Sequence, residues 1–314
     1  MSKDQTRIFG TSAPDLQAAA QELRAGHLIA FPTETVYGLG GDATNPTAVA
    51  GIYAAKGRPS FNPLIVHVGD ADQAAQFAEF NSVARTLANA FWPGPMTLVL
   101  PLRPNHGLAS LVTAGLPTVA VRVPAHPVAR GLLGAFGGPV AAPSANPSGK
   151  ISPTRAAHVI DGLSGRIAGV VDGGECKVGL ESTIIAPDTP PRLLRPGGLA
   201  AEEIEAALGT ALASAEGGKI TAPGQMTSHY APEQAVRLNV TQADPHAFTI
   251  GFGDICGDVS LSETGDLHEA AARLFDVLHL ANASGQPIAV APIPFHGLGV
   301  AINDRLARAA APRD

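Results

Sequence analysis

The sequence predicts a mixed α/β fold followed by a smaller second α/β unit. Two observations lead to this prediction: short apolar runs alternate with helical patterns, and some neighbouring strands are joined by turns rather than by helices. The chain has 314 residues, a length that suits two domains, and a small, polar stretch follows residue 213. We therefore expect a first domain at 1–209, a linker at 210–232 and a second domain at 233–314.

Composition limits the class of protein. Hydrophobic residues make up 45% of the chain and charged residues 15%, and the formal net charge is −6, which argues against a protein that mainly coats nucleic acid. Cys176 and Cys256 have no metal-ligand spacing and fit a reducing cytoplasm. No signal-peptide core is visible, and no apolar run reaches the roughly 18 residues that span a bilayer. We expect a cytoplasmic protein without a membrane segment.

Helices are predicted where apolar residues recur at helical spacing between a capping residue and a stop signal. The second helix illustrates this, because Asn45 is a favoured N-cap, Pro46 suits the first turn and Gly57 is a C-terminal stop. Ser152 and Pro153 are interpreted in the same way, as the start of a later helix. The predicted helices cover 12–26, 45–56, 70–80, 82–91, a segment from 152 onward, 200–208, 266–278 and 298–310.

Strands are predicted from short apolar runs bounded by turn residues. Within 117–127, Val119, Val121 and Val123 share one face, while Ala120 and Arg122 share the other. The other predicted strands are 28–31, 64–66, 97–100, 140–142, one after 181–183, one that ends at 195, and, in the second unit, 235–240, 248–252 and 288–293.

Two cations follow the second helix. Lys56 ends the helix, and Arg58 lies in a loop that is stiffened by Pro59 and Pro63 and that also carries Asn62. Two cations on a rigid loop suit a polyanion such as a triphosphate. The alternative is that both side chains are solvated charges at the end of a helix.

Polar loops follow two of the predicted strands. Loop 32–40 is rich in hydroxyl groups and comes where an α/β sheet usually binds ligands, although an ordinary turn is the alternative. Loop 139–154 carries Ser144, Asn146 and Ser152 among small residues that let backbone amides approach an anion, in a spacing unlike a Walker A motif. By itself, the second loop is equally compatible with an ordinary serine-rich loop.

Arg122 interrupts an otherwise apolar strand and needs a partner, since an unpaired buried guanidinium is costly. That partner is either an internal carboxylate or a ligand carboxylate held by two parallel hydrogen bonds. Segment 222–232 either docks the linker on a domain or closes over a ligand as a lid. The second unit shows no catalytic constellation, and His268 and His279 are interpreted as surface residues.

Seven stretches, in order, resemble motifs of the YrdC/TsaC family of threonylcarbamoyl-AMP synthases in its long two-domain form. They are FPTETVYGLG, KGRPSFNPLIVH, WPGPMT, VAVRVPAHP, APSANPSGKISPT, GLESTI and LRPGG. The likeness is dense over 13–200, and APGQMTSHYAP with the tail resembles the long form's linker and extra domain. The resemblance implies a YrdC-like twisted mixed sheet, an ordered linker and a Rossmann-like C-terminal domain.

The resemblance also implies a reaction: L-threonine, bicarbonate (or CO2) and ATP give threonylcarbamoyl-AMP and pyrophosphate, for threonylcarbamoyladenosine formation on tRNA. Lys56 and Arg58 would be catalytic, and Mg2+ would be held mainly by the ATP phosphates rather than by a metal site of the protein. The implied ATP contacts are Arg58, Asn62, Thr118, Ser144, Asn146, Ser152, Arg195 and Tyr230. The implied L-threonine contacts are Thr35, His67, Arg122, Ala142 and Ser182.

Two rival functions belong to other classes. One is an RNA-binding module of the same fold, which the acidic net charge of −6 opposes. The other is a carbamoyl-transfer maturation factor, which the absence of an acylphosphatase-like or zinc-ribbon region opposes. As partners we expect the three substrates and a tRNA-modifying transferase machinery that takes the product. We expect neither a membrane nor strong direct binding to nucleic acid.

Overall fold

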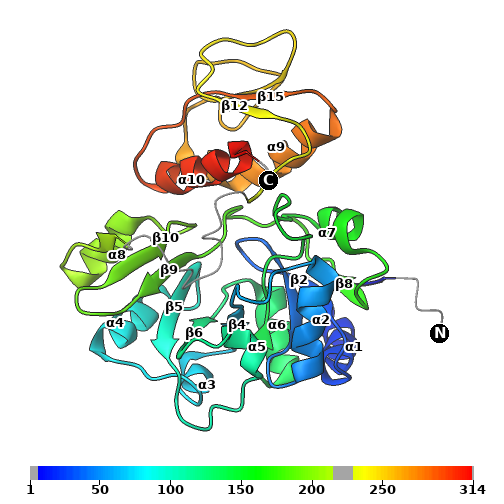
Figure 1. The fold of residues 1–314 in the computed structure, drawn as a ribbon, viewed down its shortest axis with the longest axis vertical. Coiled ribbons are helices and arrows are strands. Elements are labelled where there is room, and N and C mark those ends of the chain that lie inside the picture. The colour runs from blue at the N-terminus through cyan, green and yellow to red at the C-terminus, as the bar shows by residue number, and fades with distance from the viewer. Residues whose placement is uncertain (1–5, 215–228, 313–314) are drawn as a thin grey trace.

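The computed structural model describes residues 6–214 and 229–312. These residues form a large body with helices around a twisted mixed sheet and a small body with one parallel sheet and two helices (Figure 1). The predicted mixed α/β fold with a smaller Rossmann-like unit is confirmed. Most of the expected linker, 215–228, lies outside the described residues. No helix among the described residues is long and apolar enough to cross a membrane.

The large sheet has the strand order β1-β8-β2-β3-β7-β4-β6-β5-β9-β10-β11 among the described residues. Its strands are β1 (Arg7–Phe9), β2 (Ile29–Pro32), β3 (Tyr37–Asp42), β4 (Ile65–His67), β5 (Met96–Pro101), β6 (Thr118–Arg122), β7 (Val140–Ala141), β8 (Gly169–Val171), β9 (Thr183–Ala186), β10 (Arg192–Arg195) and β11 (Ala213–Ser214). Its helices are α1 (Ala13–Arg24), α2 (Pro46–Lys56), α3 (Ala71–Ala74), α4 (Ser82–Phe91), α5 (Ser110–Thr113), α6 (Pro127–Phe136), α7 (Ala156–Leu163) and α8 (Ala201–Leu208).

Helix α2 forms for the reasons that the sequence indicates. The Asn45 side chain accepts hydrogen bonds from the backbone N–H groups of Thr47 and Ala48, and Pro46 occupies the first turn. Gly57 ends the helix at a φ of 60°, in the left-handed region where a residue without Cβ is unstrained. The helix therefore stops at Lys56 and leaves Arg58 in the loop, as expected.

Two helix predictions are wrong. The expected helix 70–80 shrinks to α3, because the backbone beyond it pairs with strand β5 instead: the Glu79 N–H donates to the Pro101 carbonyl. Ser152 does not cap a helix, since α7 begins at Ala156 after Arg155. The Ser152 hydroxyl instead donates to the Glu181 carboxylate. Helices α5 and α6 were not predicted, and Tyr37–Asp42, partly within the expected loop 32–40, form strand β3.

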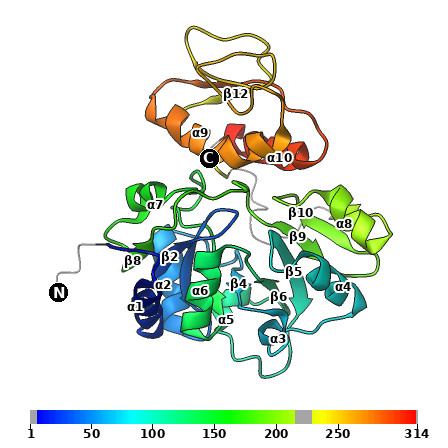
Figure 2. The ribbon, with the colours of Figure 1, turned by 180° about the vertical axis from the view of Figure 1, so that it is seen from behind.

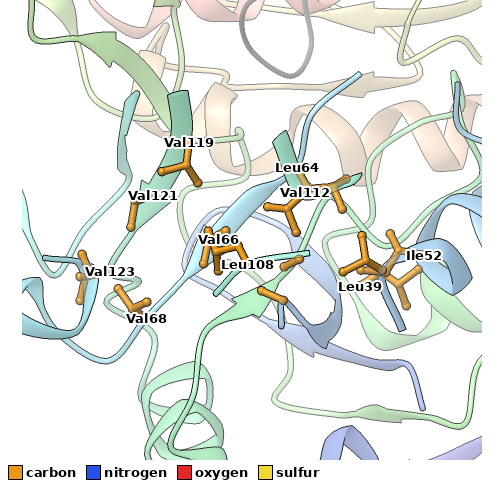
Figure 3. Packing of buried hydrophobic residues seen from close by; sticks show 14 of the residues in the cluster. Leu39, Ile52, Leu64, Val66, Val68, Leu108, Val112, Val119, Val121 and Val123 are labelled. Atoms are coloured by element: carbon orange, nitrogen blue, oxygen red, sulfur yellow. The ribbon is translucent and has the colours of Figure 1, made fainter. Parts of the chain in front are cut away.

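Strands β4 and β6 are parallel, with Ile65 opposite Ala120 and His67 opposite Arg122. Because side chains alternate along a strand, one set of residues enters the core and the other faces the opposite side. Figure 3 shows the core set, in which Leu64, Val66 and Val68 of the β4 segment pack near Val119, Val121 and Val123. The other set contains both His67 and Arg122. These two side chains therefore point to the same face of the sheet, in agreement with the alternation predicted around Val119.

The small body has strand order β12-β15-β13-β14, with all neighbouring strands parallel. Its elements are β12 (Val236–Leu238), β13 (Phe248–Gly251), β14 (Val259–Ser260), α9 (Leu267–Ala283), β15 (Ile288–Val290) and α10 (Leu298–Ala310). Both helices lie on the side of the small sheet that faces the large body (Figures 1 and 2). Its apolar cluster includes Val36, Ile151 and Leu180 of the large body, so the two cores are in contact.

Polar contacts also join the two bodies. Arg155 Nε donates to Asp276 Oδ1 at 2.6 Å. The rings of His158 and His279 stack with centroids 3.8 Å apart, and His279 Nε2 lies 3.1 Å from the Ser152 carbonyl oxygen. The interpretation of His279 as a surface residue is therefore wrong: it is half-buried at the interface, whereas His268 is exposed.

Candidate functional site

A cavity lies between the loops at the strand ends of the large body and the segment that enters the small one. Nearly every residue that lines it comes from the sequence motifs. The lining residues are Thr33, Thr35, Val36, Gly38, Arg58, Ile65, His67, Arg122, Ala142, Pro143, Ser144, Glu181, Ser182, Arg195, His229 and Tyr230. All five residues of the expected L-threonine set are present. Among the expected ATP contacts, Asn62, Thr118, Asn146 and Ser152 do not line it, and neither does Lys56.

Arg122 has the internal carboxylate partner that was one of its two alternatives. Its Nη2 donates to Glu34 Oε1 at 2.5 Å and its Nη1 to Thr35 Oγ1 at 2.8 Å. The other Glu34 oxygen accepts from the backbone N–H groups of Ala125 and His126. Burial would raise the pKa of Glu34, but Arg122 and these hydrogen bonds hold it below its usual value. The partner does not exclude a ligand, because Arg122 lines the cavity.

His67 offers the cavity a neutral imidazole. Burial, with a smaller effect of Arg122, lowers the pKa of His67 to about 3. Its Nδ1 is buried without a hydrogen-bond partner among the described residues, and its ring lies edge-to-face against Phe31. A buried polar atom normally has a partner, so the Nδ1 of His67 is suited to a hydrogen bond with a polar group of a ligand.

The Lys56 ammonium supports the wall of the cavity. Its Nζ donates to the carbonyl oxygens of Ser144 at 2.6 Å and Asn146 at 2.5 Å, so it holds loop 143–146 in place. Burial and the nearby Arg58 lower the pKa of Lys56 well below its usual value.

Arg58 reaches the cavity from a fixed position. Its Nη2 donates to Asn62 Oδ1 at 2.7 Å and to the Pro63 carbonyl at 2.8 Å. Burial lowers the pKa of Arg58 to about 10, and the charge on Arg195 adds to this effect. At neutral pH both guanidinium groups remain charged and face the same space, which favours an anion.

Ser182 is held between two neighbours. Arg195 Nη2 donates to its carbonyl oxygen at 2.8 Å, and its hydroxyl lies 2.7 Å from that of Thr97. The Ser182 hydroxyl and the Arg195 guanidinium are therefore fixed in position relative to each other at the cavity wall.

The segment 229–230 lines the cavity on the side of the small body and is called the roof below. Tyr230 is buried with a φ of 60°, a conformation that costs a non-glycine residue about 1–3 kcal/mol. Its ring meets that of His229 at a centroid distance of 4.0 Å and that of Phe275 at 5.5 Å. Within the part of the chain that the structure describes, His229 Nδ1 is buried without a partner, and burial lowers the pKa of His229 to about 3.

Sequence reasoning missed three buried charges near the cavity: Glu34, Glu181 and Arg305. The two glutamates stand inside motifs that were quoted, but nothing in the sequence shows which arginines they face. In the described part of the chain, no group of three or more histidine, cysteine, aspartate or glutamate residues could hold a metal ion.

Two family models together match almost the whole chain. The one described as "Telomere recombination" matches residues 21–197, and the one described as "Threonylcarbamoyl-AMP synthase, C-terminal domain" matches 199–311. The chain belongs to the threonylcarbamoyl-AMP synthase family. The synthase of Bacillus subtilis is 41% identical, with 99% of this chain and 97% of the relative covered. The synthase of Pyrococcus abyssi is 40% identical, with 95% of this chain and 94% of the relative covered.

Solved structures of this synthase family agree over the full length. The crystal structure of Pyrococcus abyssi Sua5 complexed with L-threonine matches with a TM-score of 0.89 and 37% identity, and covers 97% of this chain and 98% of that one. A variant of the same protein, with a histidine and the adjacent tyrosine replaced by alanine, matches with a TM-score of 0.88. The family models meet near residue 198, and the finer division at 209 and 232 stays our proposal.

Proposed function

We propose that this chain makes threonylcarbamoyl-AMP and pyrophosphate from L-threonine, bicarbonate or CO2, and ATP. One observation carries the proposal: a single cavity joins a compact polar pocket to two fixed guanidinium groups. His67, Arg122 and Ser182 form the pocket, while Arg58 and Arg195 form the cationic end. Membership of the synthase family and the L-threonine bound in a relative that matches over its whole length support it.

The pocket suits the three polar groups of L-threonine. Arg122 would bind the carboxylate, since only part of its fork is used by Glu34 and Thr35. The neutral His67 and the Ser182 hydroxyl can accept from the amine or bond to the side-chain hydroxyl. Thr35 and the backbone at Ala142 complete the proposed threonine contacts.

The chemistry needs no nucleophile from the protein. The threonine amine attacks CO2 with loss of a proton, or bicarbonate with loss of water, to give a carbamate. A carbamate oxygen then attacks the α-phosphorus of ATP and pyrophosphate leaves. The protein contributes positioning and stabilises the charge that develops on the phosphates.

The cationic end suits the phosphates of ATP. Arg58 and Arg195 would contact them directly, while Lys56 would keep loop 143–146, with Ser144 and Asn146, in a binding shape. We propose that Asn62 holds Arg58 and that Thr118 and Ser152 complete the ATP side. Mg2+ would arrive on the phosphates as part of the substrate, because Glu34 and Glu181 are already engaged by arginines.

A cover over the cavity would protect the carbamate intermediate. A carbamate decarboxylates readily in water, so a site that excludes water protects it. Tyr230 and His229 line the cavity, and we propose that they move aside for the substrates and close over them before the transfer.

Beyond the site, we propose that the product passes to a tRNA-modifying transferase and that the chain itself binds nucleic acid weakly, in line with its net charge of −6. The free thiols of Cys176 and Cys256 fit the reducing cytoplasm that we propose as its compartment.

Pyrophosphate release by the purified protein with MgATP and bicarbonate tests the proposed function. We expect release that depends on L-threonine and is much slower with D-threonine. Equal release with and without threonine would contradict the proposal.

A further inference from the structure

Arg305 on helix α10 is a buried cation that the proposed chemistry does not use. It belongs to the small body, yet its side chain is 0% exposed and reaches into the wall of the site. A charged residue is almost never fully buried unless it is paired, so its partners indicate its role.

Those partners are parts of the candidate site. Arg305 Nε donates to Glu181 Oε2 at 2.8 Å, and the other Glu181 oxygen accepts from the Ser152 hydroxyl at 2.5 Å. The guanidinium carbon lies 5.3 Å from the centre of the Tyr230 ring, within range of a cation–π contact. Nη1 donates to Asp304 on the same helix at 2.7 Å. One arginine of the small body therefore contacts both the wall and the roof of the cavity.

The contact between Arg305 and Glu181 is important because Glu181 carries a negative charge. Glu181 lines the cavity that we propose for a polyphosphate, where an uncompensated carboxylate would repel the ligand. Burial would raise the pKa of Glu181, but Arg305 and Arg195 hold it below its usual value. The carboxylate thus stays ionised, and the nearby cations offset its charge.

A purely structural role for Arg305 is poorly supported. The two bodies are already joined by a shared apolar cluster, by Arg155 with Asp276 and by the stacked rings of His158 and His279. A buried ion pair is a weak source of stability compared with apolar packing of the same volume. Tying the bodies together therefore does not require an arginine at this place.

We infer that Arg305 is a positioning residue for ATP binding: it fixes Glu181, and through it Ser152, and it holds the Tyr230 ring over the cavity. The small body thereby completes the ATP end of the site. This inference rests on the proposed function and adds a task for the second domain.

Several charged or titratable groups surround Glu181 and influence its ionisation. They are Arg195 from β10, Arg305 and Asp304 from α10, His229 and Tyr230 from the segment before β12, and Ser152 from the loop after β7.

The test compares Arg305→Met, Arg305→Lys and the control Arg155→Met, which removes an interface ion pair away from the cavity. ATP affinity is measured by calorimetry, and steady-state constants by pyrophosphate release across pH. We expect Arg305→Met to lower kcat/KM for ATP about 100-fold, because the ATP end is misplaced. The KM for threonine should change much less, and Arg155→Met should resemble the wild type.

The pH profile separates positioning from general damage. In Arg305→Met the pKa of Glu181 should rise and its charge is no longer offset, so ATP binding and activity should recover as the pH is lowered and Glu181 becomes neutral, over a range where the wild type is flat. Arg305→Lys restores a cation beside Glu181 and should restore the flat profile, with ATP binding still weaker than in the wild type because the planar fork is lost.

Wild-type ATP affinity in Arg305→Met would overturn the inference, and so would equal losses in Arg305→Met and Arg155→Met. If Arg305→Met does not fold, Arg305→Lys decides, and wild-type ATP affinity in that variant would overturn the inference too. Absence of threonine-dependent release by the wild type would overturn the proposed function instead, and calorimetry of ATP binding would still decide the role of Arg305.

Discussion

At the scale of residues, the buried charges of the site are held in pairs or by carbonyl oxygens. Arg122 faces Glu34, Arg305 faces Glu181 and Lys56 faces two carbonyl groups. Arg58 is held by side-chain and backbone oxygens while it still lines the cavity. Substitutions should therefore separate into those that remove a ligand contact and those that leave a buried partner unpaired.

Arg58→Ala should remove a cation from the proposed phosphate contacts. We expect kcat/KM for pyrophosphate release to fall by about 100-fold or more, as for other groups that stabilise developing charge. The exposed cation of a neighbouring loop provides a control, Lys150→Ala, whose activity should stay close to that of the wild type. Thermal unfolding would verify that both variants fold. Near-normal activity of Arg58→Ala would remove Arg58 from the mechanism.

Arg122→Lys should affect threonine more than ATP. The lysine keeps a charge beside Glu34 but loses the planar fork that can hold a second carboxylate. A charge-assisted hydrogen bond contributes about 1.5–3 kcal/mol, so the KM for L-threonine should rise about 10- to 100-fold while the KM for ATP changes little. Steady-state kinetics with each substrate varied in turn would measure both. Equal effects on the two constants would argue against a carboxylate clamp.

The ion pair of Glu34 should also be visible in stability. The pKa of Glu34 in the folded protein is below its ordinary value of 4.5, so the unfolded chain binds more protons than the folded one between the two pKa values. The stabilisation is therefore present above about pH 4.5 and is lost as the pH falls further. Urea unfolding should show a difference in unfolding free energy between the wild type and Glu34→Gln that shrinks at acid pH. A difference independent of pH would contradict this reading.

At the scale of elements, local signals located the loops of the site but not their partners. Asn45, Pro46 and Gly57 determine α2 by themselves, so this helix could be predicted. The expected helix at 70–80 could not be excluded from sequence, because what shortens it is the pairing of residue 79 with Pro101. In the same way, sequence could not show that the Ser152 hydroxyl donates to Glu181, 29 positions away, and that α7 starts only at Ala156.

The segment 229–230 is the element whose movement the account requires. Tyr230→Ala should open the roof and lower the yield of threonylcarbamoyl-AMP per pyrophosphate released, because water can then attack the α-phosphorus of ATP in place of the carbamate and give AMP and pyrophosphate. Tyr230→Phe keeps the ring and the backbone strain, and should retain most of the coupling. Chromatography of the products beside a pyrophosphate assay gives the ratio. An unchanged ratio in Tyr230→Ala would rule out a role of the ring in excluding water.

At the scale of the whole molecule, the site depends on residues distant in sequence. Glu34 and Arg122 are 88 positions apart, and Glu181 and Arg305 are 124 apart. Sequence motifs predicted most of the lining because each motif is contiguous. They could not predict Arg305, since one arginine in an amphipathic helix normally indicates a solvated face. The contribution of the small body became visible only in the structure, where α10 lies on the side of the small body that faces the large one (Figure 2) and Arg305 pairs with Glu181.

The most direct test of the central claim is the composition of the product. The purified protein would be supplied with MgATP, L-threonine and 13C-bicarbonate, and the products analysed by mass spectrometry. The account predicts an adenylate that contains threonine and the labelled carbon, formed together with pyrophosphate. An adenylate of threonine without the labelled carbon, or ADP with phosphate as the nucleotide products, would contradict it.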